Sequence, residues 1–215
     1  MKFFSIILAR GGSKGVPMKN IKFLKGSPLI SYSIKASNES KYVDQTWVSS
    51  DSDKILDCSK KFGAFTLKRP FAISGDKSSS EEAIEHFCNQ INFDHMIFIQ
   101  PTSPFINSKY IDEAIQLYID KRYDSIVCVS KIHHNLWINR EPMYNLSKRE
   151  MRQSASNEKF IETGMFYITS KKNFLESKSR ISGNVGFYKI PYFHSFEIDS
   201  LDDFIFIERI YDIVK

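Results

Sequence analysis

The sequence lacks any long apolar run. No stretch approaches the ~20 apolar residues that a membrane-spanning helix needs, although 42% of the residues are hydrophobic. The opening segment, Met1 to Leu8, is apolar but has no small-residue cleavage site before the glycines that follow it. We therefore interpret it as a strand rather than a signal peptide. These absences predict a cytoplasmic protein that does not enter a membrane.

Cysteine and clustered positive charge are also scarce. Cys58, Cys88 and Cys128 are far apart and lack metal-ligand spacing, which indicates reduced thiols rather than a disulfide framework or a zinc site. The net charge is +5, but the lysines are scattered among acidic residues and no basic helix is present. The composition argues against a nucleic-acid partner, which would show strongly salt-dependent affinity. An anionic small molecule explains the excess charge equally well.

Strand and helix patterns alternate along most of the chain, without internal repeats. The length of 215 residues suits one domain, residues 1–215. Four strand-then-helix units in succession favour right-handed crossovers and a mainly parallel sheet between two layers of helices. Expected strands are 3–8, 46–50, 64–68, 95–100, 124–129, 164–169, 185–190 and 196–198, and expected helices are 28–36, 53–62, 80–91, 107–122, a short one near 174, and 201–214.

The alternation breaks in the segment 131–160. It is polar, shows no helical or strand period, and carries Trp137, Met143 and two adjacent histidines, His133 and His134. Neighbouring side chains diverge, and no Cys, Asp or Glu follows at ligand spacing, so we do not interpret the histidines as a metal site. A loop of this length is usually functional or pairs with another surface.

A glycine-rich turn follows the first strand. Ile7 to Asn20 reads Ile-Leu-Ala-Arg-Gly-Gly-Ser-Lys-Gly-Val-Pro-Met-Lys-Asn. Glycines can adopt positive φ and let backbone N–H groups approach an anion, while nearby cations balance its charge. The spacing matches neither the Walker phosphate loop nor the dinucleotide fingerprint. It predicts a polyphosphate site, and an ordinary surface turn with solvated lysines is the alternative.

Polar residues follow successive predicted strands, where ligands bind in open α/β sheets. Glu197 and Asp199 flank Ile198 in the last expected strand, and alternation would point both to the same side. Such a pair can hold Mg²⁺, although solvent-facing acids on an edge strand are the alternative. The other strand-end residues are Arg10, Asp51, Arg69 and Gln100.

Together these segments resemble the acylneuraminate cytidylyltransferases, the CMP-sialic acid synthetase family. The resemblance covers nearly the whole chain in order. Its motifs are Ala-Arg-Gly-Gly-Ser-Lys-Gly with Lys19 and Asn20, Val-Ser-Ser-Asp51, Arg69-Pro70 followed by Asp76 and Ser78 to Ser80, Gln100-Pro-Thr-Ser-Pro104, the Gly164 to Ile168 strand, and Glu197-Ile-Asp199.

The resemblance implies a Rossmann-like nucleotidyltransferase fold and a cytidylyltransferase reaction. The anomeric hydroxyl of a nonulosonic, sialic acid-like sugar would attack the α-phosphorus of CTP and release pyrophosphate, with Mg²⁺ as cofactor, for surface polysaccharide assembly. It also implies a homodimer in which the 131–160 excursion reaches the partner's sugar pocket. Implied residues are Arg10 and Lys19 for catalysis; Ala9, Arg10, Gly11, Gly12, Ser13, Lys14, Asn20, Arg69 and Ser80 for the nucleotide; Gln100, Thr102, Ser103 and Tyr167 for the acidic sugar; and Glu197 and Asp199 for the metal.

The chain also departs from the resembling family. Pro104 is followed by Phe105 and Ile106 where sialic acid enzymes tend to carry an arginine, and Glu162 lies near the expected acceptor pocket. A sugar carboxylate needs a positive or strongly donating partner, which weakens the sialic acid assignment specifically. Two alternatives therefore stay open. One is the same fold using GTP and a sugar 1-phosphate, and the other is a non-catalytic nucleotide-sugar-binding protein.

Overall fold

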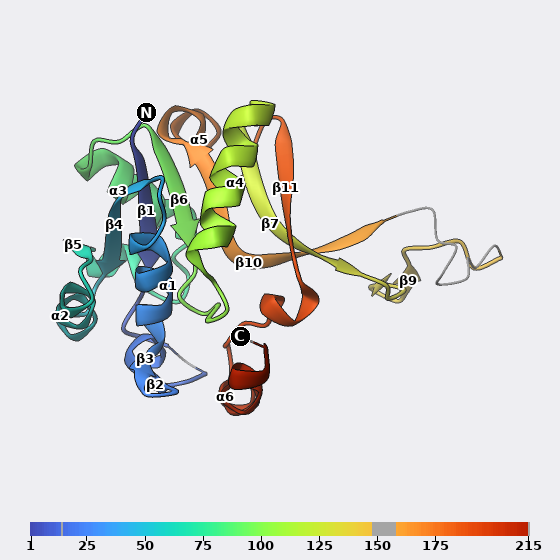
Figure 1. Ribbon diagram of the computed structural model, residues 1–215, viewed down its shortest axis with the longest axis horizontal. Coiled ribbons are helices and arrows are strands. Elements are labelled where there is room, and N and C mark those ends of the chain that lie inside the picture. Colours follow the sequence, from blue (N-terminus) through green and yellow to red (C-terminus); the bar gives the residue numbers. More distant parts are fainter. Residues whose placement is uncertain (14, 148–157, 215) are drawn as a thin grey trace.

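A seven-stranded sheet forms the centre of the protein (Figure 1). A computed structural model describes residues 1–13, 15–147 and 158–214. The strand order is β11-β7-β10-β6-β1-β4-β5. The strands are β1 (Phe3–Leu8), β4 (Val43–Ser50), β5 (Phe65–Lys68), β6 (His95–Ile99), β7 (Ser125–Ile132), β10 (Lys159–Ser170) and β11 (Val185–Ile190). Only β10 pairs antiparallel within it, so the mainly parallel sheet predicted from the sequence is confirmed.

Helices cover both faces of this sheet. They are α1 (Leu29–Asn38), α2 (Asp53–Lys61), α3 (Ser80–Gln90), α4 (Ser108–Lys121), α5 (Lys171–Ser177) and α6 (Leu201–Val214), with single 3₁₀ turns η1 (Lys19–Ile21), η2 (Phe71–Ile73) and η3 (Tyr192–Ser195). One buried cluster packs α1, α2 and α4 on the sheet, and a second packs α3 and α5 on the other face. The predicted three-layer arrangement is thereby confirmed. Within residues 1–13, 15–147 and 158–214, each helix is too short or too polar to span a bilayer.

Local sequence determines where these helices begin and end. Ser79 accepts a hydrogen bond from the Glu82 N–H, and the Glu82 carboxylate accepts one from the Ser79 N–H, which forms a capping box at the start of α3. At the start of α4 the Asn107 side chain accepts a hydrogen bond from the Tyr110 N–H. Gly63, at φ +85°, follows α2 and supplies the left-handed turn that ends it.

The polar segment 131–160 is only partly as expected. The sheet strands β7 and β10 run further than predicted and leave the body as a paired ribbon, with Lys159 opposite Ile132. A short hairpin, β8 (Trp137–Ile138) and β9 (Glu141–Pro142), lies beyond it. We call residues 131–147 and 158–162 the arm, which projects from the body in Figure 1. The prediction that this segment contains no strand is therefore wrong for residues 131–132, 137–138, 141–142 and 159–160. Positions 148–157 lie outside the described residues.

The last helix lies apart from the two main layers. The short strands β2 (Phe23–Leu24) and β3 (Ser27–Pro28) form a hairpin after η1. A third buried cluster joins that hairpin to α6 through Leu24, Phe204 and Ile207. The predicted strand over 196–198 is wrong, because that segment is irregular and connects η3 to α6. Burial of Ile198 in the third cluster, rather than sheet pairing, holds it.

Candidate functional site

A cleft of about 440 Å³ opens at the carboxyl ends of β1, β5 and β6. The loop between β5 and α3, residues 69–79, forms one wall of it. The ends of β1 and β6, the segments that follow them, the start of α3 and the residue Asp199 form the rest. Predicted site residues that line the cleft are Arg10, Ser13, Lys19, Asn20, Arg69, Ser80, Gln100, Thr102 and Asp199. Residues from both ends of the chain therefore meet in one cavity.

The glycine turn is built differently from the predicted anion cradle. Gly11 and Gly12 do not adopt positive φ, and the Gly11 N–H donates to the Asp51 carboxylate at 2.8 Å instead of facing the cleft. Gly15 is needed for close packing, because a Cβ there would collide with the carbonyl oxygen of Asp199. Gly12 is exposed, and Lys14 lies outside the described residues. Asp51 thus shapes the turn from β4.

Arg10 bridges the two sides of the cleft mouth. Its guanidinium lies 2.9 Å from an Asp76 carboxylate oxygen and donates to the Gly75 carbonyl at 3.1 Å. Both partners belong to the loop between β5 and α3, and the Arg10 and Asp76 side chains are 35% and 43% exposed. An ion pair this accessible is weak, so an incoming anion can compete for the arginine.

Lys19 and Asn20 follow on η1. The Lys19 ammonium donates to the Ile198 carbonyl at 2.8 Å and to the Asp199 carboxylate at 3.1 Å. The Asn20 amide nitrogen donates to the Arg10 carbonyl at 3.1 Å, which ties η1 to the glycine turn. The Asn20 side-chain oxygen is buried and accepts no hydrogen bond within the described part of the chain. A ligand donor reaching this oxygen would satisfy it.

Arg69 adds a buried cation to the cleft. It follows β5, is 5% exposed, and donates through Nε to Ser74 Oγ at 2.9 Å. Burial lowers the pKa of Arg69, and the nearby Asp51 carboxylate opposes that decrease. Ser80 lies across the loop at the start of α3, next to the helix N-terminus. Exposed N–H groups and positive charge at this wall suit an anionic or oxygen-rich ligand.

Gly164 shapes the other end of the site. Its φ of +66° accompanies a register shift in β10 between Glu162 and Tyr167. A Cβ at Gly164 would lie 2.5 Å from Glu197 Oε1 and 2.7 Å from Gln100 Oε1. Glycine therefore allows these two polar side chains to come together beside the bulge, and no other residue fits there without displacement.

Glu197 is a half-buried acid next to the cleft. Its carboxylate accepts a hydrogen bond from Ser103 Oγ at 3.0 Å. Burial raises the pKa of Glu197 to about 7, the Ser103 hydrogen bond opposes this, and the charge of Asp199 adds to it. The predicted alternation of Glu197 and Asp199 within a strand was wrong. The Ile198 N–H instead donates to the Thr102 carbonyl at 2.9 Å. This bond anchors Glu197 and Asp199 beside the turn that follows β6.

The two carboxylates fit the oxygen chemistry of Mg²⁺. A buried acid with a raised pKa gains from a cation nearby, and Asp199 already faces Lys19. No group of three or more His, Cys, Asp or Glu that could hold a metal occurs among residues 1–13, 15–147 and 158–214. Mg²⁺ usually takes one or two carboxylates and completes its shell with phosphates and water. The donor set therefore suits an ion that arrives with a polyphosphate.

Other predicted residues lie behind the cleft. Ala9 is buried and its N–H donates to the Ser49 carbonyl at 3.0 Å. The Tyr167 ring is buried and stacked on Phe98, and its hydroxyl donates to the Glu162 carboxylate. Neither Ala9 nor Tyr167 lines the cavity. Their binding roles stay predictions.

Several lining residues were missed by the sequence interpretation. Leu8, Phe98 and Ala83 lie on the strand and helix faces that surround the cleft. Their hydrophobic periodicity is the same as that of ordinary core residues, so no sequence pattern distinguishes them. Asp76 and Ser78 were noticed only as parts of a motif. Their position on one wall depends on how the loop between β5 and α3 folds.

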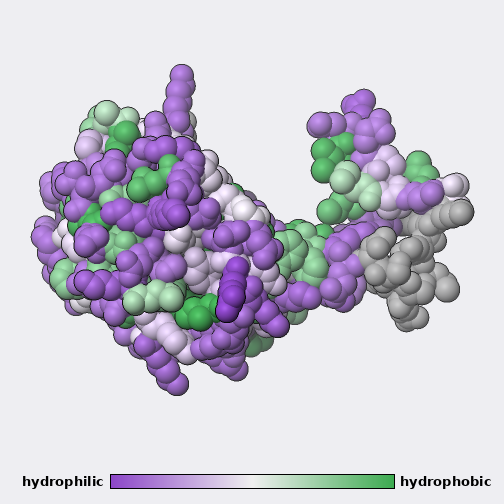
Figure 2. Space-filling model, turned by 90° about the horizontal axis from the view of Figure 1, so that it is seen from above, coloured by the Kyte–Doolittle hydropathy of each residue, from purple (hydrophilic) through white to green (hydrophobic). Residues whose placement is uncertain are grey.

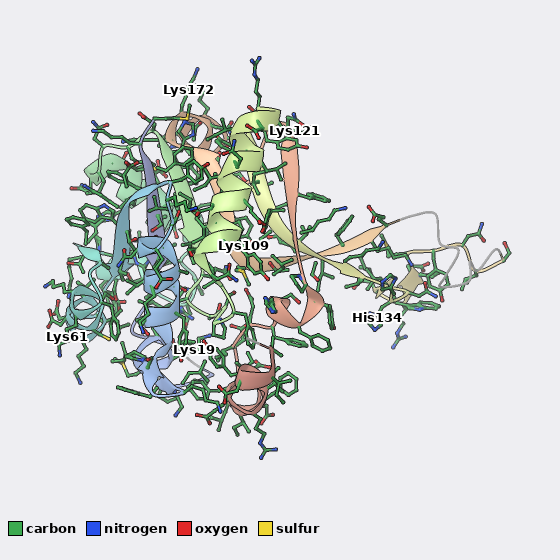
Figure 3. The ribbon with its side chains drawn as sticks, in the orientation of Figure 1. Lys19, Lys61, Lys109, Lys121, His134 and Lys172 are labelled. Atoms are coloured by element: carbon green, nitrogen blue, oxygen red, sulfur yellow. The ribbon has the colours of Figure 1, made fainter. Side chains whose placement is uncertain are left out.

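Taken together, the described residues bring three cations to the cleft, Arg10, Lys19 and Arg69, and one carboxylate of the predicted metal pair, Asp199, while Glu197 lies beside the lining residues. Figure 3 shows Lys19 at the same end of the molecule as α6, whereas Lys121 and Lys172 lie at the opposite end. Fixed positive groups of this kind stabilise a polyanion and the charge that develops when it reacts. The arrangement suits transfer of a phosphorus-containing group.

Comparison with known proteins gives the family. A family model described as cytidylyltransferase matches residues 4–211. N-acylneuraminate cytidylyltransferase A of Danio rerio is 37% identical over 205 residues, which are 91% of this chain and 47% of that protein. The N-acylneuraminate cytidylyltransferase of Escherichia coli is 32% identical over 215 residues, 94% of this chain and 50% of that protein. The chain spans about half the length of these curated relatives.

Solved structures agree on the fold. A CMP:2-keto-3-deoxy-manno-octonic acid synthetase complexed with CTP superposes with a TM-score of 0.79 at 14% identity and covers 99% of both chains. A 4-diphosphocytidyl-2C-methyl-D-erythritol synthase from Anaerococcus prevotii gives a TM-score of 0.67 at 11% identity and covers 98% of both chains. At these identities the likeness concerns the fold.

Proposed function

Because the chain belongs to the cytidylyltransferase family, we propose that it transfers CMP from CTP to the anomeric hydroxyl of a nonulosonic, sialic acid-like sugar and releases pyrophosphate. The observation that carries this proposal is the contact between Lys19 and Asp199 at 3.1 Å. It joins η1, which follows the glycine turn, to the acidic segment from the other end of the chain. A magnesium-bound triphosphate needs both kinds of group in one place.

Residues in and around the cleft would share the parts of this reaction. Arg10 and Lys19 would neutralise the triphosphate and then the departing pyrophosphate. The sugar oxygen forms its bond to the α-phosphorus as the bond from that phosphorus to the bridging oxygen breaks, so positioning and charge matter more than covalent help. Nucleoside contacts would come from Asn20, Arg69 and Ser80, and acceptor contacts from Gln100, Thr102, Ser103 and Tyr167.

Glu197 and Asp199 would hold the Mg²⁺ ion. When bound, such an ion neutralises phosphate oxygens and orients the reacting group. Within this chain, Ser103 holds the Glu197 carboxylate and Lys19 holds that of Asp199. Both acids are therefore oriented by contacts within the chain, although the Asp199 side chain is 74% exposed and its ion pair with Lys19 is the weaker of the two contacts.

The arm supports the proposal of a homodimer. It carries exposed apolar side chains, visible as green spheres on the projecting part of Figure 2. Trp137 and Ile138 are each 54% exposed, and Met143 is 60% exposed. Aromatic residues and methionine are enriched in interfaces. A second copy of this chain would cover them, and its arm would complete the sugar pocket, as the family resemblance implies.

A cytoplasmic location also belongs to the proposal. Cys58, Cys88 and Cys128 are free thiols. Free thiols persist in reducing compartments. Such a compartment would also supply CTP to an enzyme of surface polysaccharide assembly.

One observation favours a second candidate function. The acceptor end carries the carboxylates of Glu162 and Glu197, and burial and the charge of Asp199 raise the pKa of Glu197. Carboxylates repel an acidic sugar unless a cation intervenes. The alternative is a nucleotidyltransferase of the same fold that uses GTP and a sugar 1-phosphate. The presence of both Glu197 and Asp199 argues against a non-catalytic binding protein, because such a protein would not need a pair of metal-binding carboxylates.

A nucleotide panel tests the proposal. The protein is incubated with Mg²⁺, each of CTP, GTP, UTP and ATP, and panels of sugar acids and sugar phosphates, and pyrophosphate release is measured. We expect release with CTP and a nonulosonic acid. Reactions without acceptor and with the Lys19→Met variant serve as controls. Release with GTP alone overturns the cytidine assignment, and binding of CTP without release under every condition supports the non-catalytic alternative.

A further inference from the structure

Arg180 lies behind the cleft, outside the set of residues assigned above. It belongs to the loop between α5 and β11, and its side chain is 20% exposed. Its guanidinium makes two hydrogen bonds to the Glu81 carboxylate, from Nε at 2.7 Å and from Nη2 at 3.0 Å. Two parallel bonds of this kind fix both direction and distance, which a lysine cannot do.

The same guanidinium also covers two aromatic rings. Its central carbon lies 5.1 Å from the centre of the Phe98 ring and 5.2 Å from that of Tyr167. Those rings are themselves stacked, with centres 5.7 Å apart on neighbouring strands β6 and β10. A planar cation over partly desolvated rings gains from the ring electrons as well as from packing.

Each partner of Arg180 continues directly into the functional site. Glu81 is in the first turn of α3, next to Ser79 and Ser80 of the cleft wall. Phe98 itself lines the cleft, and the Tyr167 hydroxyl donates to Glu162 at the acceptor end. Arg180 therefore connects the start of α3, which forms part of the cleft wall, to the Phe98 and Tyr167 rings, which lead toward the acceptor end.

The loop that carries Arg180 is held in place. Asn173 donates to Ser182 Oγ at 2.9 Å, and Ser179 and Ile181 exchange two hydrogen bonds across Arg180. An anchored arginine can set the position of its partners rather than follow them.

We propose that Arg180 is a positioning residue for both substrates, because it fixes the start of α3 against the Phe98 and Tyr167 rings. This inference rests on the proposed function for the identity of the substrates. Arg180 contacts no reacting group. Its loss should therefore weaken substrate binding more than it slows the chemical step.

The chain offers a matched control. Lys178, in the same loop, pairs with Glu85 of α3 at 2.7 Å, but its side chain is 58% exposed and it covers no cleft ring. Lys178→Met and Glu85→Gln remove an ion pair between the same two elements. These variants show the effect of losing an ion pair between this loop and α3 when the residues that line the cleft are unchanged.

The experiment measures nucleotide affinity by calorimetry with Mg²⁺, and KM and kcat for both substrates, in intact protein. We expect Arg180→Met and Glu81→Gln each to weaken nucleotide binding about tenfold and to change kcat by less than about threefold, as for a displaced binding group. The double variant should bind no more weakly than Arg180→Met, since Arg180→Met already removes the ion pair that Glu81→Gln removes. Arg180→Lys should recover part of the affinity, and the control variants should stay within about twofold of the original protein.

Three results would overturn the inference. They are an unchanged affinity in folded Arg180→Met, additive losses in the double variant, and equal losses in the Lys178→Met control. If Arg180→Met does not fold, Arg180→Lys and Glu81→Gln decide the question by the same criteria. If the original protein binds GTP and not CTP, the proposed function fails, and the variants are compared with GTP.

Discussion

Individual charges decide what the cleft can hold, and Arg10 is the most telling of them. It lies at the end of β1, and Asp76 and the Gly75 carbonyl hold it across the cleft mouth. These contacts orient the guanidinium without satisfying all five of its donors. A triphosphate can therefore take the free donors and displace the exposed carboxylate.

Replacing Arg10 by alanine should lower turnover by roughly two orders of magnitude, which is the scale of losing one transition-state charge contact. Steady-state pyrophosphate release with saturating nucleotide measures it. The exposed Lys121, at the opposite end of the molecule, supplies a control in Lys121→Ala, which should keep normal turnover (Figure 3). Near-normal turnover in folded Arg10→Ala would remove this residue from the mechanism.

At this scale the sequence predicted residue types better than residue roles. Arg10 and Lys19 were chosen because they flank glycines after a buried strand, Asn20 was chosen from the family resemblance, and all three line the cleft. The Gly11 N–H was expected to face an anion, but the Asp51 carboxylate takes it. A partner 40 residues away decides that hydrogen bond, and no local pattern contains this information.

Among the elements, the bulge in β10 does most to shape the acceptor end. Gly164 has φ +66°, and its backbone passes so close to Gln100 and Glu197 that a side chain would displace them. Gly26, in the β2–β3 hairpin, has a similar φ of +80° but nothing within 4 Å of where a Cβ would lie. Comparing substitutions at these two glycines therefore separates the effect of backbone strain from the effect of steric contact.

Gly164→Ala should raise the KM for the sugar acceptor at least tenfold, because the new methyl group displaces the Gln100 and Glu197 carboxamide and carboxylate oxygens. Both substitutions place an alanine in the left-handed region, so each should lower the free energy of unfolding by about 1–2 kcal/mol. Gly26→Ala should leave the KM for the sugar acceptor unchanged. Chemical denaturation and acceptor titrations of both variants provide the comparison. Equal KM values in the two variants would show that contact at Gly164 does not matter.

Elements with strong local patterns were predicted well. The capping box of α3 and the asparagine cap of α4 are readable in the sequence, and both helices begin where expected. The strand over 196–198 failed because Phe196 and Ile198 alternate with Glu197 as strand residues do. Their burial instead comes from Phe105, which lies far away in sequence, and from α6, which begins three residues after Ile198 and folds back on it. Tertiary packing overrode local propensity at this point.

On the scale of the whole molecule, the site depends on how the end of the chain docks. Asp199 directly precedes α6, and α6 is attached through Ile207 and its neighbours in the third buried cluster rather than through the sheet. Lys25 and Asp212 form an exposed ion pair at 2.7 Å across the same junction, which adds little. Apolar packing of one helix therefore holds the acidic segment against Lys19.

Loosening α6 should weaken nucleotide binding without unfolding the sheet. Ile207→Ala removes a fully buried side chain from the α6 junction, and Ile115→Ala removes one from beneath α4 in the main core. Each substitution should lower the free energy of unfolding by about 2–5 kcal/mol. Ile207→Ala should also raise the nucleotide KM and increase hydrogen exchange in α6 selectively, because Asp199 moves with that helix. Ile115→Ala should lower global stability and keep the KM. A normal nucleotide KM in Ile207→Ala, with α6 exchanging faster, would mean that the acidic segment keeps its place without the helix, and that Lys19 alone is enough to hold it.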